Sequence, residues 1–194
     1  RLEIFYPLRP YIVNQGWGVY HPEYPDYFGF KYHNGVDLAL KYGQIGLAPT
    51  DCVCLRSDTQ LGGGNFVTLL SDKEWSFDDN IKSLVLFDFL HNKENLIKAG
   101  DRLRVGDKIF AGDSTGYSNG NHSHIQFRRV KWEKDLGQNV NAFRRADGLV
   151  LIDIDKNEAN NSFDPTPYWN KRYADEAAVQ LKIIEAAEKL IVAL

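Results

Sequence analysis

Hydrophobic and polar residues alternate over several short segments of the chain, the pattern expected of β-strands that bury one face. Such segments lie at residues 36–40, 52–55, 65–70 and 122–127, with a more continuously apolar one at residues 83–91. Turn-forming residues separate the segments, for example Gly116–Gly120 before the last of them. The pattern predicts a mainly β fold: a compact antiparallel β-sheet domain of short strands and long loops.

Two glycine-rich features fit the turns of such a domain. Leu61–Asn65 contains three consecutive glycines, but no Lys-Ser/Thr pair and no helix signal follow, so a hairpin connection is favoured over a phosphate-binding loop. Gly-Asp pairs recur at Asp101, Asp107 and Asp113. Because glycine and aspartate serve tight turns, we interpret these aspartates as turn residues and not as metal ligands.

The segments outside this core pattern are less regular. Residues 1–32 contain four prolines and are predicted to be irregular chain with short extended pieces and no helix. Residues 128–165 are polar and loop-rich. Asp153–Asn157 has some of the spacing of a calcium loop, but Glu158 stands where such a loop needs glycine, so a solvated loop is favoured.

The C-terminal segment has the periodicity of an α-helix. Residues 170–194 contain no Gly or Pro, and apolar residues recur along one helical stripe at Tyr173, Ala177, Ile184, Ala187, Ile191 and Leu194. Since Asp164–Pro167 is a stop signal, we predict a domain over 1–168 and an amphipathic helix or linker over 169–194. Packing of the helix on the β-domain and its continuation as a coiled coil or linker are equally compatible with the pattern.

Composition excludes several classes of function. The 194 residues are 43% hydrophobic with a net charge of −3, which is enough for one substantial core and lacks the basic footprint of a nucleic-acid-binding protein. No apolar run approaches the roughly 18 residues of a membrane span. Methionine is absent even at position 1, as expected of a fragment or processed form. Cys52 and Cys54 are too close for an easy disulfide, and we expect them to pack on one strand face.

Four of the five histidines form a pattern with a mechanism. His122 and His124 are separated by one residue on a predicted strand, so they share a face about 6–7 Å apart, which suits a metal ligand beside a catalytic base. His33 and Asp37 supply the ligand types that zinc favours, with Gly35 allowing a tight backbone between them. His91 ends the apolar strand. A His/His/Asp set with one open position is typical of catalytic zinc, whereas His21 is interpreted as structural.

These residues resemble the lysostaphin-type, LytM-like zinc metalloendopeptidases. The family pattern, His-x-x-x-Asp, then a lone His after a strand, then His-x-His, is met in order by His33–Asp37, His91 and His122–His124. The resemblance extends over about residues 7–168. It implies that His33, Asp37 and His124 bind Zn²⁺, and that His91 and His122 are the catalytic pair that positions water and stabilises the tetrahedral intermediate.

The resemblance also implies a function and a location. We expect a zinc endopeptidase that cleaves cross-bridge or stem peptides of bacterial cell-wall peptidoglycan outside the cytoplasm, in the periplasm, at the cell surface or as a secreted enzyme, with a phage particle as a further setting. The alternative is a catalytically silent member that activates another wall enzyme, with residues 170–194 as the partner-binding helix. An acidic, bulky stretch at Asp72–Asn80 is expected to lengthen a loop near the cleft, which leaves substrate preference open.

Overall fold

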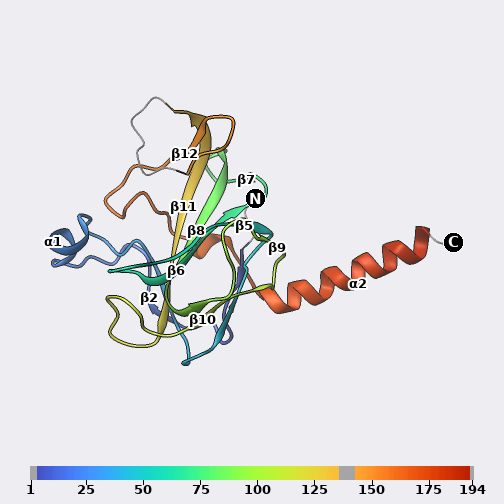
Figure 1. Cartoon of the computed structure of the whole chain (residues 1–194), viewed down its shortest axis with the longest axis horizontal. Coiled ribbons are helices and arrows are strands. Elements are labelled where there is room, and N and C mark those ends of the chain that lie inside the picture. The colour runs from blue at the N-terminus through green and yellow to red at the C-terminus, as the bar shows by residue number, and fades with distance from the viewer. Residues whose placement is uncertain (1–3, 136–142, 193–194) are drawn as a thin grey trace.

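A computed structural model describes residues 4–135 and 143–192. Within these ranges the chain forms mostly strands and one long helix (Figure 1). The elements are β1 (Ile4–Tyr6), β2 (Val13–Gln15), α1 (Tyr24–Phe28), β3 (Gly35–Ala39), β4 (Ile45–Leu47), β5 (Cys52–Gln60), β6 (Gly64–Ser71), β7 (Trp75–Ser76), β8 (Lys82–Asn95), β9 (Arg102–Leu103), β10 (Lys108–Gly112), β11 (His122–Lys134), β12 (Leu149–Asp153), a 3-10 turn (Thr166–Tyr168), β13 (Trp169–Tyr173) and α2 (Ala174–Val192).

One antiparallel sheet organises the described residues. Its strands follow the order β2-β3-β11-β8-β6-β5-β9, and β12 adds to β11 beyond the end of β3. The strands β8 and β11 are the longest and lie side by side at its centre (Figure 1). A separate parallel pair joins β1 to β13. The predicted fold class is therefore confirmed, although the two central strands, with 14 and 13 residues, are longer than the hydrophobic pattern indicated.

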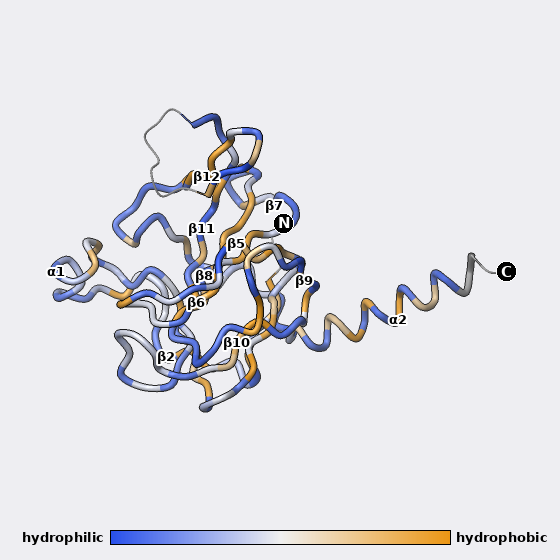
Figure 2. Tube along the Cα trace, viewed as in Figure 1, coloured by the Kyte–Doolittle hydropathy of each residue, from blue (hydrophilic) through white to orange (hydrophobic). Residues whose placement is uncertain are grey.

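Side-chain alternation divides the two faces of this sheet. On β8 and β11 the odd-numbered residues Phe87, Phe89, Ile125 and Phe127 are fully buried in the main core. Hydrophobic residues accordingly concentrate on the strands in Figure 2. The even-numbered residues of the same strands face the other side, because successive side chains of a strand point to opposite faces. The polar residues of the candidate site lie on that second face.

Three regions differ from the sequence prediction. Residues 128–134 continue β11 instead of forming a loop, because they pair with β12 and need only one apolar face. A one-turn helix, α1, interrupts the irregular N-terminal region; Pro25 suits its first turn, and Gly29, at φ 77°, ends it. The stretch Asp72–Asn80 forms β7 and packs Phe77 against Phe163 and Tyr168. It is not among the residues that line the cleft described below.

Several turn predictions are confirmed. The three glycines connect β5 to β6 as a hairpin. Carboxylate oxygens of Asp101 and Asp107 accept hydrogen bonds from the backbone N–H groups of Lys98 and Arg104, which is the behaviour of aspartates in turns. The 153–157 segment, predicted to be a solvated loop, differs from expectation, because Asp153 and Asp155 form ion pairs with arginines of β11.

Cys52 and Cys54 are free thiols buried on one face of β5. Burial raises the pKa of both thiols, that of Cys54 to about 11. The prediction that these residues pack together on a strand is confirmed.

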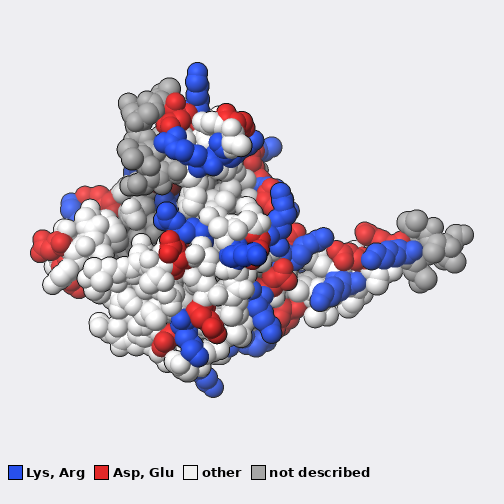
Figure 3. Space-filling model, viewed as in Figure 1, with Lys and Arg blue, Asp and Glu red and all other residues white. Residues whose placement is uncertain are grey.

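The C-terminal helix packs only through its first turns. Ala174 and Ala177 are buried against Val105, while Val179 and the side chains described after it are exposed. Gly106 permits the contact, since a Cβ there would lie 2.6 Å from the Cβ of Ala178. The rest of α2 projects away from the β-domain (Figure 1) and carries charged side chains of both signs (Figure 3). Packing on the β-domain is thus confirmed for the first turns, while continuation as a coiled coil or linker stays a prediction; Leu194 lies outside the described residues.

The predicted domain boundary at residue 168 stays a prediction. β13 follows it directly and pairs with β1, so the chain returns to the N-terminal strand before α2 begins. No helix in the described part of the chain combines the length and apolarity that a membrane crossing needs.

We predict that the first turns of α2 contribute to stability and the exposed turns do not. Ala177→Glu places a charge in a buried contact and should lower the free energy of unfolding by about 3 kcal/mol, a fall in Tm of roughly 6–10 °C. Val179→Glu, two residues along at a position that is 59% exposed, is the matched control and should change stability by less than about 0.5 kcal/mol. Equal melting curves for the two variants would contradict the packing of this helix.

Candidate metal centre

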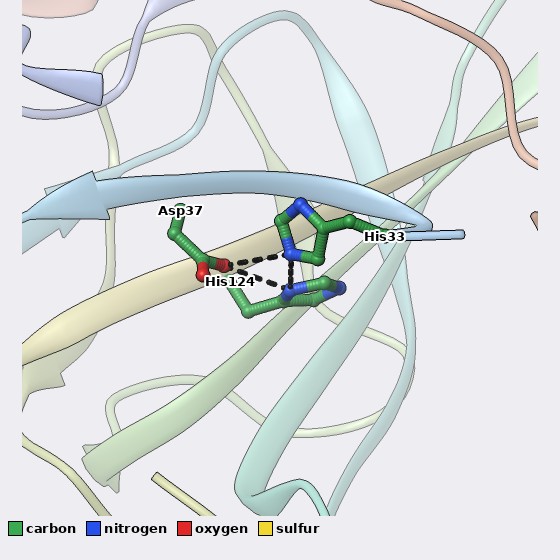
Figure 4. Close-up of side chains that lie close together, drawn as sticks. All are labelled: His33, Asp37 and His124. Carbon is green, nitrogen blue, oxygen red and sulfur yellow. Dashed lines mark hydrogen bonds and ion pairs between the residues drawn. The ribbon is translucent and has the colours of Figure 1, made fainter. Parts of the chain in front are cut away.

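Strand pairing brings the predicted metal ligands together. His124 on β11 lies directly opposite Asp37 on β3, so both side chains point to the same face of the sheet. His33 precedes β3 by two residues and turns its ring toward the same point. Figure 4 shows the three side chains converging from these two elements. The family resemblance implied this set of three residues, and the structure places them within contact of one another.

Three potential ligand atoms form a small triangle. Nε2 of His33 lies 3.1 Å from Nδ1 of His124, which lies 2.9 Å from Oδ1 of Asp37. The third edge, from His33 Nε2 to Asp37 Oδ1, is 3.2 Å. Nδ1 of His33 donates to the carbonyl oxygen of Gly16 at 2.8 Å, so in the neutral ring Nε2 carries a lone pair toward the triangle.

The triangle fits a tetrahedral cation. Zinc bonds of about 2.0–2.1 Å place neighbouring ligand atoms of a tetrahedron roughly 3.3–3.4 Å apart, close to the three observed edges. Among the described residues this is the one cluster of His, Cys, Asp or Glu that brings three ligand atoms within 4.8 Å of one another. Two imidazoles and one carboxylate leave a fourth position for water or substrate, which is the donor set of catalytic and not structural zinc.

His91 and His122 form a second pair beside the triangle. Their ring centroids lie 4.8 Å apart. Nδ1 of His91 donates to the carbonyl oxygen of Thr115, and Nδ1 of His122 to that of Gly120, each at 2.8 Å. In the neutral tautomer that these hydrogen bonds select, each ring presents an unprotonated Nε2. Nε2 of His122 lies 3.7 Å from Oδ1 of Asp37, so this pair borders the proposed metal position.

A β-bulge sets the position of His91. The prediction placed this histidine at the end of its strand, but β8 continues for four more residues. His91 has φ 67°, and the pairing of β8 with β6 shifts register at this point. A bulge re-aims side chains that strict alternation would direct elsewhere. His91 thereby reaches the face that carries His124 and His122.

The three-glycine hairpin holds this bulge in place. The N–H of His91 donates to the carbonyl oxygen of Gly63, and the N–H of Tyr117 to that of Gly62, each at 2.8 Å. A Cβ on Gly116 would lie 2.3 Å from the backbone nitrogen of Gly64. The hairpin and the loop before β11 thus approach as bare backbone. The glycines serve this close contact as well as the turn, which the sequence alone did not show.

Burial and hydrogen bonding shift the pKa values of these groups. Burial lowers the pKa of His91 to about 4 and also lowers that of His124, so both rings are neutral at neutral pH. Burial alone would raise the pKa of Asp37, but hydrogen bonds with His124 and His33 outweigh it and hold the pKa below its usual value. Neutral imidazoles and an ionised carboxylate are the forms that bind a metal ion.

The five residues line one cleft of about 1250 Å³. Its wall also includes residues that the sequence interpretation missed, among them Gln15, His21 and the aromatic residues of α1. His21 contacts Gln15 at 2.6 Å and stacks on Tyr24 with ring centroids 4.4 Å apart. No spacing rule links these residues to the histidines, because α1 and the loop around it reach the cleft through tertiary folding.

Comparison with known proteins agrees with this arrangement. The profile of the family described as "Peptidase family M23" matches residues 31–142. The chain belongs to peptidase family M23. The matched range includes His33, Asp37, His91, His122 and His124.

Two curated relatives and one solved structure are similar to this M23 chain. An uncharacterized metalloprotease of Buchnera aphidicola is 30% identical over 94 residues, covering 48% of this chain and 22% of that protein. The glycyl-glycine endopeptidase ALE-1 of Staphylococcus capitis is 26% identical over 151 residues, covering 75% and 38%. The chain thus spans less than half the length of these relatives. The lysostaphin catalytic domain of Staphylococcus simulans shares the fold, with a TM-score of 0.54 and 22% identity over 81% of this chain and 91% of that one.

We predict that Gly35 is needed for metal binding. A Cβ there would lie 2.5 Å from the carbonyl oxygen of Ile125 and 2.7 Å from Nε2 of His124, so β3 and the ring would have to move apart. Gly35→Ala should weaken zinc binding at least tenfold in a competition titration, because ligand positions must hold within about 0.5 Å. Gly16→Ala, which has no atom within 4 Å of its added Cβ, is the control and should bind zinc as the parent does.

Proposed function

We propose that this M23 chain is a zinc-dependent endopeptidase that hydrolyses peptide bonds of bacterial cell-wall peptidoglycan. One observation carries the proposal: three ligand atoms within 4.8 Å of one another open onto the cleft that also holds two further histidines. In this proposal His33, Asp37 and His124 hold the zinc ion. When bound, zinc lowers the pKa of a water molecule and polarises the scissile carbonyl.

The chain's own residues then handle protons and orientation. His91 and His122 each fix one ring nitrogen on a carbonyl oxygen, which leaves Nε2 to accept a proton from water. Once protonated, either ring can donate to the developing negative charge on the substrate oxygen or to the leaving amine. The hydrogen bond from His33 to Gly16 orients its ring before any metal arrives. A preorganised site of this kind favours catalysis over simple binding.

The choice of peptidoglycan as substrate rests on similarity. The relative from Staphylococcus capitis is named a glycyl-glycine endopeptidase, a peptide-bond hydrolase for glycine-rich segments. Action on the wall further implies a location outside the cytoplasm, in the periplasm, at the surface, secreted or in a phage particle. A helix-mediated partner would bind along residues 170–194, where Val179, Ile183 and Ile184 are exposed.

The alternative function is that of a silent binding or activator module. The projecting α2 is the observation that favours it, since a helix with exposed apolar residues offers a docking surface beside the domain. However, a silent module has no need for a complete set of ligands and two oriented histidines. Wall hydrolysis therefore stands ahead of it.

We predict different losses from the two histidines of the His-x-His motif. His124→Ala should lose most of its bound zinc, because it removes one of three ligands. His122→Ala should keep about one zinc ion per chain and lose turnover by about 10²–10⁴-fold, the usual contribution of a general acid or base. Metal analysis and the release of wall peptides, measured on the same preparations, check both. Equal zinc loss in the two variants would refute this division of roles.

A digest of defined cell walls tests the substrate. The zinc-loaded chain should release peptide fragments whose masses identify the bond that is cut, and a chelator should abolish release until zinc is restored. A generic unfolded protein in parallel shows whether wall peptides are preferred. Zinc-loaded protein that cuts neither substrate, but is captured by another wall enzyme through α2, would establish the activator alternative instead.

A further inference from the structure

The cleft continues past the histidines into a second groove on the same face of the sheet. This groove encloses about 440 Å³. Gln60, Leu90 and Gln126 line both cavities, so the two adjoin. A peptide that reaches the histidines from this side therefore passes over the second groove.

Strand register places the groove relative to the metal site. Gln126 on β11, two residues from His124, lies opposite Asp88 on β8. Asp88 lies opposite Thr68 on β6, and Thr68 opposite Arg56 on β5. A β-bulge between Cys54 and Arg56 turns Arg56 toward this face. Three strand spacings separate Gln126 from Arg56, about 14 Å, which an extended peptide covers in roughly four residues.

The carboxylates of the groove are fully engaged. Arg128 pairs with Asp88 at 3.1 Å and with Asp153 at 3.3 Å. Asp88 also accepts a hydrogen bond from Thr68 at 2.6 Å, and Asp153 accepts one from Asn161 at 3.1 Å. With two carboxylates against one guanidinium, this network keeps one net negative charge, but both carboxylates are already paired with Arg128.

The remaining charges of the groove are positive. Arg56 and Lys156 both line it, and neither forms an ion pair with any residue in 4–135 or 143–192. The guanidinium of Arg56 lies 5.9 Å from the ring centroid of Phe66 and 5.7 Å from that of Phe143. Two flanking aromatic rings restrict this side chain without supplying a counter-ion. The excess is local, since the whole chain carries a net charge of −3.

We infer that this groove is a subsite for an anionic peptide segment, with Arg56 binding a substrate carboxylate about five residues from the scissile bond. The inference rests on the proposed function, because the same peptide must occupy the cleft. A guanidinium held between rings can bind a carboxylate through two parallel hydrogen bonds, and Lys156 adds positive charge. A bridge made only of glycine has no side-chain carboxylate for this subsite. The subsite thus favours stem peptides, which carry free carboxylates, over glycine bridges.

Matched peptides test the subsite. Dye-labelled glycine peptides with a single Glu at each position in turn are compared with peptides that have Gln at the same position. Binding to the zinc-loaded full chain is followed by fluorescence anisotropy, and cleavage by mass analysis of the same samples. The parent should prefer one Glu peptide about tenfold over its Gln partner, and added salt should reduce that preference. D-Glu occurs in wall stem peptides but not in ordinary proteins. Peptides with D-Glu therefore test whether the subsite accepts the carboxylate of a wall peptide or only that of an ordinary protein.

Two arginine variants provide the decisive comparison. Arg56→Gln should bring the Glu/Gln ratio close to one, whereas Arg102→Gln should keep the parent ratio. Arg102 is an exposed arginine on β9, outside the groove and without an ion pair among the described residues. Melting curves confirm that both variants fold.

The outcomes separate the two proposals. Cleavage without charge preference, or a ratio that Arg56→Gln leaves unchanged, overturns the subsite while the endopeptidase stands. Charge-selective binding that depends on Arg56, with no cleavage of any peptide or wall, supports the subsite and overturns the endopeptidase.

Discussion

The register of β11 between β3 and β8 is the constraint on which the site depends. His124 lies opposite Asp37 on one side and Leu90 on the other. Because strand side chains alternate, a slip of one residue would turn His124 into the core and Ile125 toward solvent. Full burial of Ile125 and Phe127 opposes that slip. The hydrophobic core therefore fixes the position of the ligands without contacting the metal position.

Close backbone contacts, in addition to strand register, position the residues of the candidate site. Strict alternation would turn His91 toward the core, because its neighbour Leu90 on the same strand already faces the candidate metal site. The bulge at His91 supplies the missing rotation, and the carbonyl oxygen of Gly63 holds it through a 2.8 Å hydrogen bond. Gly64 and Gly116 have no side chains, which lets two loops from distant parts of the chain approach each other closely. The geometry of the candidate site thus depends on glycine positions as much as on the histidines.

Hydrophobic alternation was sufficient to predict the fold class, and residue spacing singled out the four histidines and Asp37 that the structure brings to one cleft. Their division into ligands and a catalytic pair came from the family resemblance and stays a prediction. His122 and His124 share a strand face by elementary geometry, and His33 and Asp37 are natural partners for them. Spacing could not place His91, because a positive φ at a non-glycine residue leaves no mark in a hydrophobic pattern. It also could not reveal the cleft wall formed by His21 and α1, which depends on contacts distant in sequence. Residues 128–134 were interpreted as loop because a half-exposed strand resembles one in polarity.

The strands β8 and β11 are longer than the candidate metal ligands alone require. The ligand residue of β11 lies within three residues of its start, yet the strand continues to Lys134. The added length places Gln126 and Arg128 on the face opposite the main core. It also places Val130 there, in a second hydrophobic cluster with Leu151 of β12. Ion pairs from Arg128 to Asp88 and Asp153 join β11 to β8 and β12 at that point. Both buried carboxylates pair with Arg128, and Arg56 and Lys156 are the lining cations that form no ion pair among the described residues. Arg56 lies across the sheet on β5, so in the proposed subsite sheet width as well as strand length would set how far along a peptide the protein discriminates.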